Sequence, residues 1–411
     1  MIKKKLVVIG NGMVGHHFLE AMVNSSVAQR YQISTFCEEP RLAYDRVHLS
    51  EFFSGKTADD LALAKPAFYQ QHGIAVYLGD QATRIDRQRK IVTSEKGVEI
   101  EYDVLVLATG SYPFVPPIAG HDREHCFVYR TIEDLEMMES SAQSATTGVV
   151  VGGGLLGLEA ANALKGLGLQ THVVEFAPRL MAVQLDEDGG KILRKKIEAI
   201  GVEVHTGKNT TLIDDGQSAR HRMHFADGEM LETDMILFSA GIRPRDNLAQ
   251  DCDLEVGARG GIVINDQCQT SDENIYAIGE CALWNEQIFG LVAPGYQMAR
   301  VVSDQLSGIN SVFTGADMST KLKLLGVDVG SIGDAHARTK GARSYVYQNE
   351  LDEVYKRLIV SEDGKHVLGA VLVGDNAAYN DIFQYYLNDI ELPEHPEGLI
   401  LPHQDDSIGG L

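Results

Sequence analysis

The sequence KKKLVVIGNGMVG, residues 3–15, decides the fold of this 411-residue chain. Its four apolar residues before the first glycine are typical of a buried parallel strand. The glycines that follow have the spacing G-x-G-x-x-G. Gly10 permits a tight turn, Gly12 lets the backbone approach a pyrophosphate, and Gly15 lets a helix pack closely on the strand. The stretch therefore predicts a strand and a helix whose N-terminus binds the phosphates of a dinucleotide.

A second apolar run, Gln32 to Cys37, strengthens this prediction because acids follow it directly. Glu38 and Glu39 stand about 20 residues after Gly15, where a carboxylate can accept hydrogen bonds from both hydroxyls of a ribose. A lone glycine motif is weak support, since glycine-rich turns also arise for packing alone. Here the strand, the helix and the acid agree, so we expect a complete dinucleotide-binding unit.

Length and composition describe an acidic protein of several domains. A chain of 411 residues exceeds what one hydrophobic core usually supports, so two or three domains are expected. The 36 basic and 58 acidic residues give a net charge of −22, which disfavours nucleic acid and anionic membranes as partners. The apolar run after the basic start is too short for a signal peptide, and no run of about 18 apolar residues predicts a membrane span.

The cysteines are odd in number and widely separated, without a CxxC or CxxxxC pair. They are Cys37, Cys126, Cys252, Cys268 and Cys281. This pattern fits neither a disulfide framework nor a metal site nor a redox-active disulfide. We therefore expect a reduced, cytoplasmic protein with no metal site.

The opening pattern returns in the middle of the chain. An apolar run at residues 148–151 precedes Gly152, Gly154 and Gly157, which repeat the glycine spacing before an alanine-rich helix. The strand after that helix ends in an acid, Glu175. Two complete fingerprints about 140 residues apart are improbable as packing accidents, so a second dinucleotide site is expected.

Other segments complete the plan. Each unit has a later strand that ends in a small-residue turn, Thr109-Gly110 in the first and Ala240-Gly241 in the second. Gly279-Glu280 places an acid at the carboxyl end of a further strand, where open α/β sheets bind ligands. Residues 58–72 are predicted to be helical. From about residue 317, short β-like runs and one helix predict a separate α+β domain.

The order of these motifs is similar to that of the two-dinucleotide-domain flavoprotein reductases, in the branch of rubredoxin and ferredoxin reductases. Three segments resemble the N-terminal flavin portion of the large subunits of NADH-dependent assimilatory nitrite reductases: Tyr44–Ser50, Thr320–Val329 and Phe383–Leu387. The resemblance implies an α/β fold with two Rossmann-like domains of the three-layer ββα type and a small C-terminal α+β domain. The implied domains are an FAD domain at 1–113 and 245–316, an NAD(H) domain at 114–244, and a C-terminal domain with a linker tail at 317–411.

The resemblance also implies roles for the residues that match the family motifs. The FAD contacts would be Gly10, Gly12, Gly15 and Glu38 at the pyrophosphate and adenosine ribose, Arg46 at the phosphates, and Thr109, Gly110, Gly279, Glu280 and Tyr296 around the flavin and its ribityl chain. The NADH contacts would be Gly152, Gly154, Gly157 and Glu175.

Two acids of the second unit bear on the nicotinamide cofactor. A carboxylate at Glu175 accepts the 2′-hydroxyl of NADH and repels the 2′-phosphate of NADPH, which favours NADH. Arg179, four residues on, leaves NADPH open. Glu159 matches the family's acid near the nicotinamide, and it equally fits an ordinary acid in the N-terminal turn of a helix.

One departure from the family concerns the flavin. Glu51 stands where relatives of the ferredoxin reductase branch carry a lysine beside flavin N5. Either Glu51 faces solvent, or Lys321 or Lys323 from the C-terminal domain supplies the positive charge. The sequence leaves these alternatives open.

No cysteine occupies the positions that carry thiols in the disulfide reductases or in the peroxidase and oxidase relatives. We therefore expect NADH to reduce FAD, and single electrons to pass to an iron–sulfur or sirohaem module or to a small electron carrier. This describes the electron-input module of assimilatory nitrite reductase. The alternatives are a stand-alone rubredoxin or ferredoxin reductase, and an NADH-sensing flavoprotein whose main role is to bind a partner.

A proline-punctuated segment from Leu392 to Pro402 is typical of a linker. The sequence leaves open whether the protein forms a homodimer.

Overall fold

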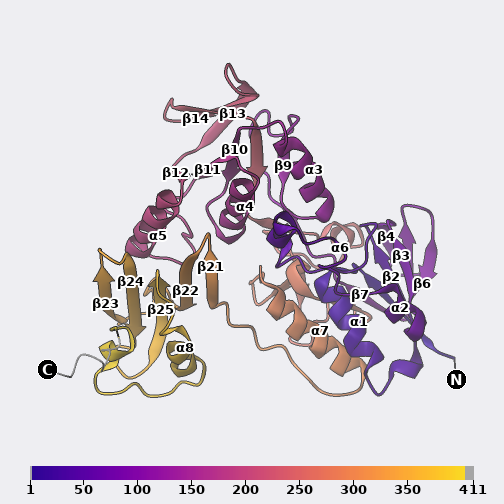
Figure 1. The fold of residues 1–411 in the computed structure, drawn as a ribbon. Coiled ribbons are helices and arrows are strands. Elements are labelled where there is room, and N and C mark those ends of the chain that lie inside the picture. The colour runs from indigo at the N-terminus through magenta and orange to yellow at the C-terminus, as the bar shows by residue number, and fades with distance from the viewer. Residues whose placement is uncertain (1, 403–411) are drawn as a thin grey trace. The chain divides into compact units, whose positions relative to one another are not determined.

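The computed structural model describes residues 2–402, which form two compact units. The first unit contains residues 2–114, 130–132 and 242–317. The second contains the remaining described residues. Figure 1 labels the helices and strands of both.

The first unit is built on a five-stranded parallel sheet with the predicted apolar run at its centre. The strand order is β19 (Ile275–Ala277), β7 (Val104–Leu107), β1 (Lys4–Ile9), β2 (Tyr31–Cys37) and β3 (Ala75–Leu78). Leu6, Val7 and Val8 are completely buried, as an interior parallel strand requires. The neighbours of β1 are the strand that leads to Glu38 and the strand that leads to the Thr109-Gly110 turn.

Helices and small sheets surround this sheet. Helix α1 (Met13–Val23) follows the glycine turn and packs against α7 (Val292–Leu306). The other helices are α2 (Pro66–His72), α6 (Asn247–Asp251) and the short η1 (Ala28–Arg30), η2 (Leu49–Ser54) and η3 (Gly279–Cys281). The remaining strands are β4 (Ala82–Asp86), β5 (Ile91–Ser94) and β6 (Glu99–Glu101) in one sheet, β8 (Ser111–Pro113) with β17 (Ile242–Pro244), and β18 (Ile262–Ile264) with β20 (Ala282–Trp284).

The second unit repeats the plan of the first. Its parallel sheet has the order β9 (Cys126–Val128), β16 (Met235–Phe238), β10 (Thr147–Val151), β11 (Gln170–Glu175) and β12 (Val202–Thr206). The fingerprint strand is again central, between the strand with the acid and the strand before the small-residue turn. The helices are α3 (Ile132–Ala142), α4 (Leu155–Gly166) and α5 (Glu187–Ala199), and an antiparallel sheet holds β13 (Thr210–Asp215), β14 (His221–Phe225) and β15 (Met230–Thr233).

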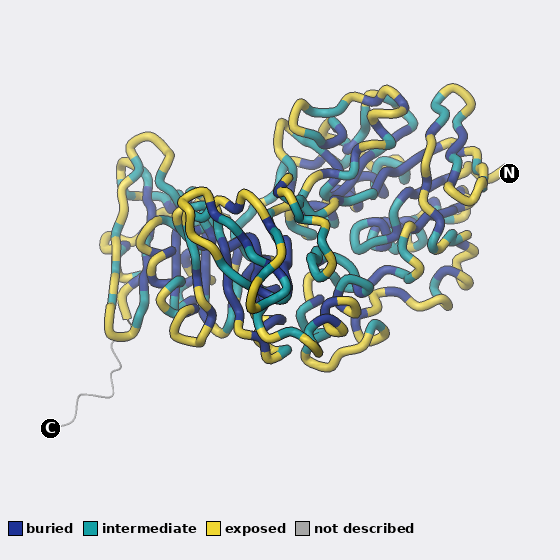
Figure 2. The backbone as a smooth tube through the Cα atoms, turned by 90° about the horizontal axis from the view of Figure 1, so that it is seen from above, coloured by how far each residue is buried: buried dark blue, intermediate teal, exposed yellow. Residues whose placement is uncertain are grey.

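The C-terminal part of the second unit is an antiparallel sheet with one longer helix. The strand order is β21 (Thr320–Leu324), β22 (Val327–Gly333), β25 (Val367–Val373), β24 (Val354–Val360) and β23 (Arg343–Asn349), followed by α8 (Tyr379–Leu387) and η4 (Pro396–Leu399). Figure 2 shows the buried residues along the strands and the exposed residues along the connecting loops. The predicted fold class is confirmed: two parallel sheets of the dinucleotide-binding type and a C-terminal α+β domain.

The predicted helix at residues 58–72 is wrong in its first half. Only α2 is helical there, and it begins at Pro66. Lys65 has an extended backbone, with φ −109° and ψ 151°, because the ring of a proline pushes the preceding residue out of the helical region. The residues before Lys65 form turns and a bridge instead.

One carboxylate, Asp186, joins α5 to the C-terminal sheet. Its Oδ1 accepts the backbone N–H of Gly189 at 3.1 Å and so caps the helix. Its Oδ2 accepts the Tyr355 hydroxyl at 2.6 Å and the Arg357 guanidinium at 2.8 Å. Burial and the hydrogen bond to Asp186 raise the pKa of Tyr355 far above its usual value. The sheet is therefore held to the helix by a partly buried, charge-assisted cluster.

We expect Asp186→Ala to lower the free energy of unfolding by about 2–4 kcal/mol, because it removes a helix cap and leaves Arg357 without its counter-ion. Asp186→Asn keeps the cap and should lose less. Urea unfolding followed by circular dichroism measures both. The matched control is Asp188→Ala, which removes a solvent-exposed acid of the same helix and should change little. Equal losses for the two alanine variants would contradict the role given to Asp186.

Candidate functional site

In the first glycine turn two glycines are tightly packed and the third, Gly12, borders open space. A Cβ at Gly10 would lie 2.1 Å from the carbonyl oxygen of Ala108, and a Cβ at Gly15 would lie 2.0 Å from the carbonyl oxygen of Gly10. Neither position has room for a side chain. A Cβ at Gly12 would meet no atom within 4 Å. Gly12 is the N-cap of α1 and no side chain caps the helix, so its first amides face open space.

The second glycine turn has the same division. A Cβ at Gly152 would lie 2.2 Å from the carbonyl oxygen of Ser239, and one at Gly157 would lie 1.9 Å from that of Gly152. A Cβ at Gly154 would again meet nothing within 4 Å, and Gly154 is the N-cap of α4 without a side-chain cap. Both helices thus present uncapped amides beside an open glycine, which is the local geometry of an anion site.

A cavity of about 320 Å³ lies beside the first glycine turn. Three of the predicted residues line it, namely Gly10, Glu38 and Thr109. Arg245 also lines it, and its guanidinium forms an ion pair with the Glu38 carboxylate. The cavity therefore brings the glycine turn, the acid of β2 and the turn after β7 together.

Arg245 is held there by the Thr109-Gly110 turn. The Thr109 hydroxyl donates to the carbonyl oxygen of Arg245 at 2.6 Å, and the Arg245 N–H donates to the carbonyl oxygen of Gly110 at 2.9 Å. Sequence reasoning missed this residue. Its signal was its position directly after the Ile242–Pro244 strand, in the segment that follows the second small-residue turn.

Arg46 is paired with an acid of the same loop region. Its guanidinium forms an ion pair with Glu39 and donates to the carbonyl oxygen of Arg130 at 2.9 Å. The guanidinium carbon lies 4.9 Å from the centre of the Tyr44 ring, whose hydroxyl donates to Glu39 at 2.7 Å. Burial is the largest single influence and would lower the pKa of Arg46, but the Glu39 carboxylate together with Tyr44 and Cys37 outweighs it, so the pKa is raised. Arg46 is therefore a fixed cation.

Glu280 belongs to the same network. Its Oε2 accepts the Ser111 hydroxyl at 2.7 Å and the Arg130 guanidinium at 2.8 Å. Arg130 thus contacts Arg46 through its carbonyl and Glu280 through its side chain. A Cβ at Gly110 would lie 3.8 Å from the Arg130 guanidinium, so the predicted Gly110 position is adjacent as well. Arg130 is a second residue that sequence reasoning missed.

Tyr296 lies in the first turns of α7 and stacks on His17, with ring centres 4.2 Å apart. Burial and the positive charge of Arg300 lower the pKa of His17. Gly279 and Gly295 both pack against Val14 of α1, where a Cβ at Gly295 would lie 2.6 Å from a Val14 methyl carbon. These close contacts place the start of α7 and the Gly279-Glu280 turn against the helix of the first fingerprint.

Glu175 is fixed beside the second fingerprint. Its carboxylate accepts the backbone N–H of Gly153 at 2.5 Å and that of Ala177 at 2.6 Å. The Arg179 guanidinium donates to the carbonyl oxygens of Leu185 and Ala182, at 3.0 and 3.4 Å. Arg179 is thus engaged by the backbone of its own loop.

Glu159 is the fifth residue of α4, and the first turn of that helix contains no acid. Its interpretation as an ordinary acid of the N-terminal turn is therefore not supported by the helix bounds. The side chain is half-buried.

Two of the three residues considered for the charge beside the flavin, Glu51 and Lys321, have partners of their own. Glu51 lies in η2 and forms an ion pair with Lys56, and both side chains are solvent-accessible. Lys321 donates to the side-chain oxygen of Asn380 at 3.2 Å and lies over the Tyr379 ring. Lys323 is exposed on the same strand. Lys56 was not singled out from the sequence, although it follows Glu51 by five residues.

The five cysteines all lie in the described part of the chain, and all have free thiols. Burial raises the pKa of Cys37 and of Cys126 to about 11, and that of Cys268 to about 12. Burial also raises the pKa of Cys252 and of Cys281. These thiols stay protonated near neutral pH, so they are poor nucleophiles.

Comparison with known families accords with this geometry. Residues 4–303 match the family described as pyridine nucleotide-disulphide oxidoreductase, and residues 319–387 match the rubredoxin NAD+ reductase C-terminal domain. The chain belongs to the pyridine nucleotide-disulphide oxidoreductase family. It is an oxidoreductase of the FAD- and NAD(P)H-dependent type, as the sequence predicted.

Relatives in this family extend over nearly the whole chain. The chain is 61% identical to the nitrite reductase (NADH) large subunit of Escherichia coli K12 over 99% of its length, and 56% identical to the nitrite reductase [NAD(P)H] large subunit of Klebsiella oxytoca, also over 99%. It covers 48% and 42% of these relatives, so it spans about half their length. Among solved structures, the NAD-dependent persulfide reductase of A. fulgidus has a TM-score of 0.84 at 25% identity, covering 94% of this chain and 77% of that one.

The residues around both glycine turns fit the two cofactors of the family. Each turn leaves open space at its second glycine, where a Cβ would obstruct a pyrophosphate, and each has an acid at the end of the next strand for a ribose. No helix within residues 2–402 has the length and apolar character needed to cross a membrane.

A crossed pair of substitutions tests the two glycine sites. Gly12→Val fills the open space before α1 and should give a folded protein that has lost its flavin. Gly154→Val fills the equivalent space before α4 and should keep the flavin but raise the KM for NADH about tenfold or more. Flavin absorbance per chain and steady-state kinetics measure the two effects, and each variant is the control for the other. Full flavin in Gly12→Val would contradict the assignment of the first turn.

Proposed function

We propose that this chain is an NADH-dependent electron-input module whose acceptor is a one-electron metal centre. Bound FAD supplies the chemistry, taking a hydride from NADH and releasing electrons singly. The proposed domains are residues 1–113 with 245–316 for FAD, residues 114–244 for NAD(H), and residues 317–411 for the C-terminal part. The observation that carries the proposal is the pair of equivalent glycine cradles, each with its own acid.

The residues of the first unit would hold and orient FAD. The amides after Gly12 would bind the pyrophosphate, and Glu38 would accept the hydroxyls of the adenosine ribose. Arg46 has five N–H donors, and Glu39 and the Arg130 carbonyl take two of them, so the guanidinium retains donors for a phosphate.

Glu280 and the start of α7 would act nearer the flavin. Glu280 is fixed by Arg130 and Ser111, which positions its carboxylate for a ribityl hydroxyl. The amides in the first turn of α7, beside Tyr296, have no side-chain cap. They would stabilise negative charge at the N1–O2 edge of the flavin.

Glu175 supports NADH over NADPH. Two backbone N–H groups fix its carboxylate beside the second fingerprint, where a 2′-phosphate would meet a negative charge. Arg179 donates to the backbone carbonyls of Leu185 and Ala182, which hold its guanidinium against its own loop. NADH preference is therefore the expected property of this site.

We expect kcat/KM to be about 10–100-fold higher with NADH than with NADPH, because charge-assisted contacts of this kind are worth roughly 1.5–3 kcal/mol. Glu175→Gln removes the negative charge and should lower the ratio of kcat/KM with NADH to kcat/KM with NADPH. Glu198→Gln changes an exposed acid of the same unit and should leave the ratio as it is. Equal kcat/KM for the two cofactors in the unsubstituted protein would rule out this role for Glu175.

The thiols and the C-terminal domain support a metal centre as the proposed electron acceptor. The five thiols have raised pKa values and lack CxxC or CxxxxC spacing, which disfavours an internal redox-active dithiol as the acceptor. The match to the rubredoxin NAD+ reductase C-terminal domain supports a protein-borne metal centre as acceptor. An iron–sulfur or sirohaem module of an assimilatory nitrite reductase fits the whole-chain likeness to those large subunits. A stand-alone rubredoxin or ferredoxin reductase is the second candidate, favoured by the C-terminal match alone.

An acceptor panel tests the proposal. The purified 411-residue chain with FAD should oxidise NADH quickly with ferricyanide or an added iron–sulfur protein, slowly with oxygen, and not with nitrite. Stopped-flow reduction by NADH separates cofactor reduction from acceptor turnover. Rapid turnover with oxygen but not with ferricyanide would reject a one-electron acceptor, and nitrite consumption by this chain alone would reject the module.

A further inference from the structure

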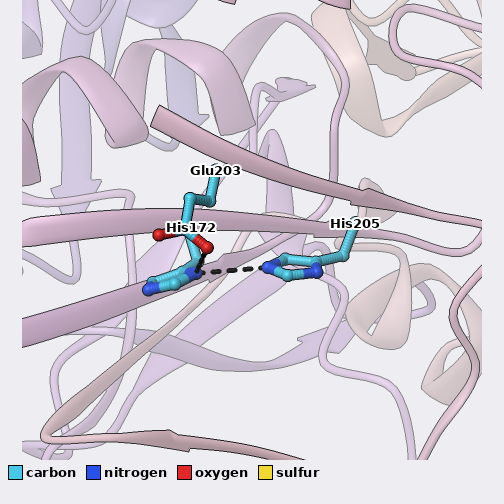
Figure 3. Close-up of side chains that lie close together, drawn as sticks. All are labelled: His172, Glu203 and His205. Carbon is cyan, nitrogen blue, oxygen red and sulfur yellow. Dashed lines mark hydrogen bonds and ion pairs between the residues drawn. The ribbon is translucent and has the colours of Figure 1, made fainter. Parts of the chain in front are cut away.

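Two histidines and a glutamate converge on neighbouring strands of the second unit. His172 lies on β11, and Glu203 and His205 lie on β12. His172 and Glu203 are register partners in the parallel pair, and His205 is two residues further along, so all three side chains are on one face. Figure 3 shows them pointing toward one another.

The contacts exceed what hydrogen bonding alone can satisfy. The His172 Nδ1 lies 3.1 Å from the His205 Nε2 and 3.5 Å from a Glu203 carboxylate oxygen. A neutral imidazole nitrogen either donates one hydrogen bond or accepts one. It can therefore make at most one full-strength hydrogen bond to these two partners, whereas a cation placed between the three atoms is bound by all of them at once.

The spacing of the three donor atoms matches a small metal ion. They all lie within 4.8 Å of one another. Metal–ligand bonds of about 2.0–2.1 Å at tetrahedral angles place donor atoms about 3.3 Å apart. The two measured distances from His172, 3.1 and 3.5 Å, fall on either side of that value. Two imidazoles and one carboxylate also form a ligand set that zinc accepts.

The surroundings support the carboxylate and give access. Gln170 donates to the other oxygen of Glu203 at 3.1 Å, which orients the carboxylate. The nearby cations are matched by acids of their own, Arg194 by Glu198 and Lys208 by Asp227 and Glu229. His172 is buried, but Glu203 is exposed and His205 is half-buried, so an ion can enter from solvent and keep a water molecule as fourth ligand.

We propose that His172, Glu203 and His205 form a binding site for a divalent transition metal, for which Zn²⁺ is the best fit. The cysteine pattern gave no sign of this site. The histidines stand 33 residues apart in the chain, so no local sequence motif indicates the site.

Metal titration of the flavin-containing chain, prepared without a histidine tag and freed of metal with a chelator, tests the proposal. One equivalent of Co²⁺ should bind with the visible spectrum of a tetrahedral ion and be displaced by Zn²⁺. His205→Gln and Glu203→Gln should each weaken binding by at least about tenfold, as loss of a ligand or its support does. The matched control is His224→Gln, which removes a histidine paired with Asp214 at 2.9 Å elsewhere in the unit and should change the Kd less than about twofold.

Thermal melting curves show whether a variant loses metal binding because it is misfolded. In the presence of chelator, the variants should have the same melting temperature as the unsubstituted protein. Added Zn²⁺ should raise the melting temperature of the unsubstituted protein and of the control only. If His205→Gln does not fold, Glu203→Gln decides the question, because Glu203 is exposed. The absence of saturable binding, or equal binding by the ligand variants and the control, would overturn the proposal.

Discussion

The close approach of each glycine turn to the neighbouring strand is the constraint on which the architecture depends. In the first unit Gly10 packs against the carbonyl oxygen of Ala108, and in the second unit Gly152 packs against that of Ser239. Both contacts are so close that a Cβ atom on the glycine would clash with the carbonyl oxygen. Because those carbonyls stand at the ends of β7 and β16, the contact also brings the next turn of each sheet to the open glycine. In the first unit that turn, Thr109-Gly110, is hydrogen-bonded to the backbone of Arg245. The cavity beside the first glycine turn is thus a consequence of backbone packing.

Charge pairing is the second organising feature of the first unit. Three arginines are each matched with a glutamate: Arg46 with Glu39, Arg130 with Glu280, and Arg245 with Glu38. The Arg46–Glu39 and Arg130–Glu280 pairs are mostly buried, where an unpaired charge is costly, so these two pairs hold their loops in place. The Arg245–Glu38 pair is more exposed. Each pair has no net charge, in a protein whose net charge is −22. A phosphate bound there, as proposed, would meet guanidinium groups that these pairs hold in place.

The sequence predicted what is local and missed what only folding brings together. The fingerprints were visible because the strand, glycines, helix and acid lie within one short stretch. Arg130 and Arg245 reach their partners across 84 and 207 residues, and no spacing rule reveals such contacts. The overextended helix at residues 58–72 has a different cause, since the apolar pattern outweighed the proline that fixes its start. The fold class survived these errors because it rests on the repeat of the fingerprint.

Strand β11 carries both Glu175, the acid proposed to contact NADH, and His172 of the histidine cluster. Side chains alternate along a strand, so His172 and Glu175, three residues apart, point to opposite faces. A metal bound by His172 would therefore lie away from the dinucleotide. The backbone provides the connection instead, because the N–H of Lys208, just beyond β12, donates to the carbonyl oxygen of Glu175 at 3.0 Å. An ion bridging β11 and β12 would steady the strand ends from which Glu175 projects, and its role would be structural rather than chemical.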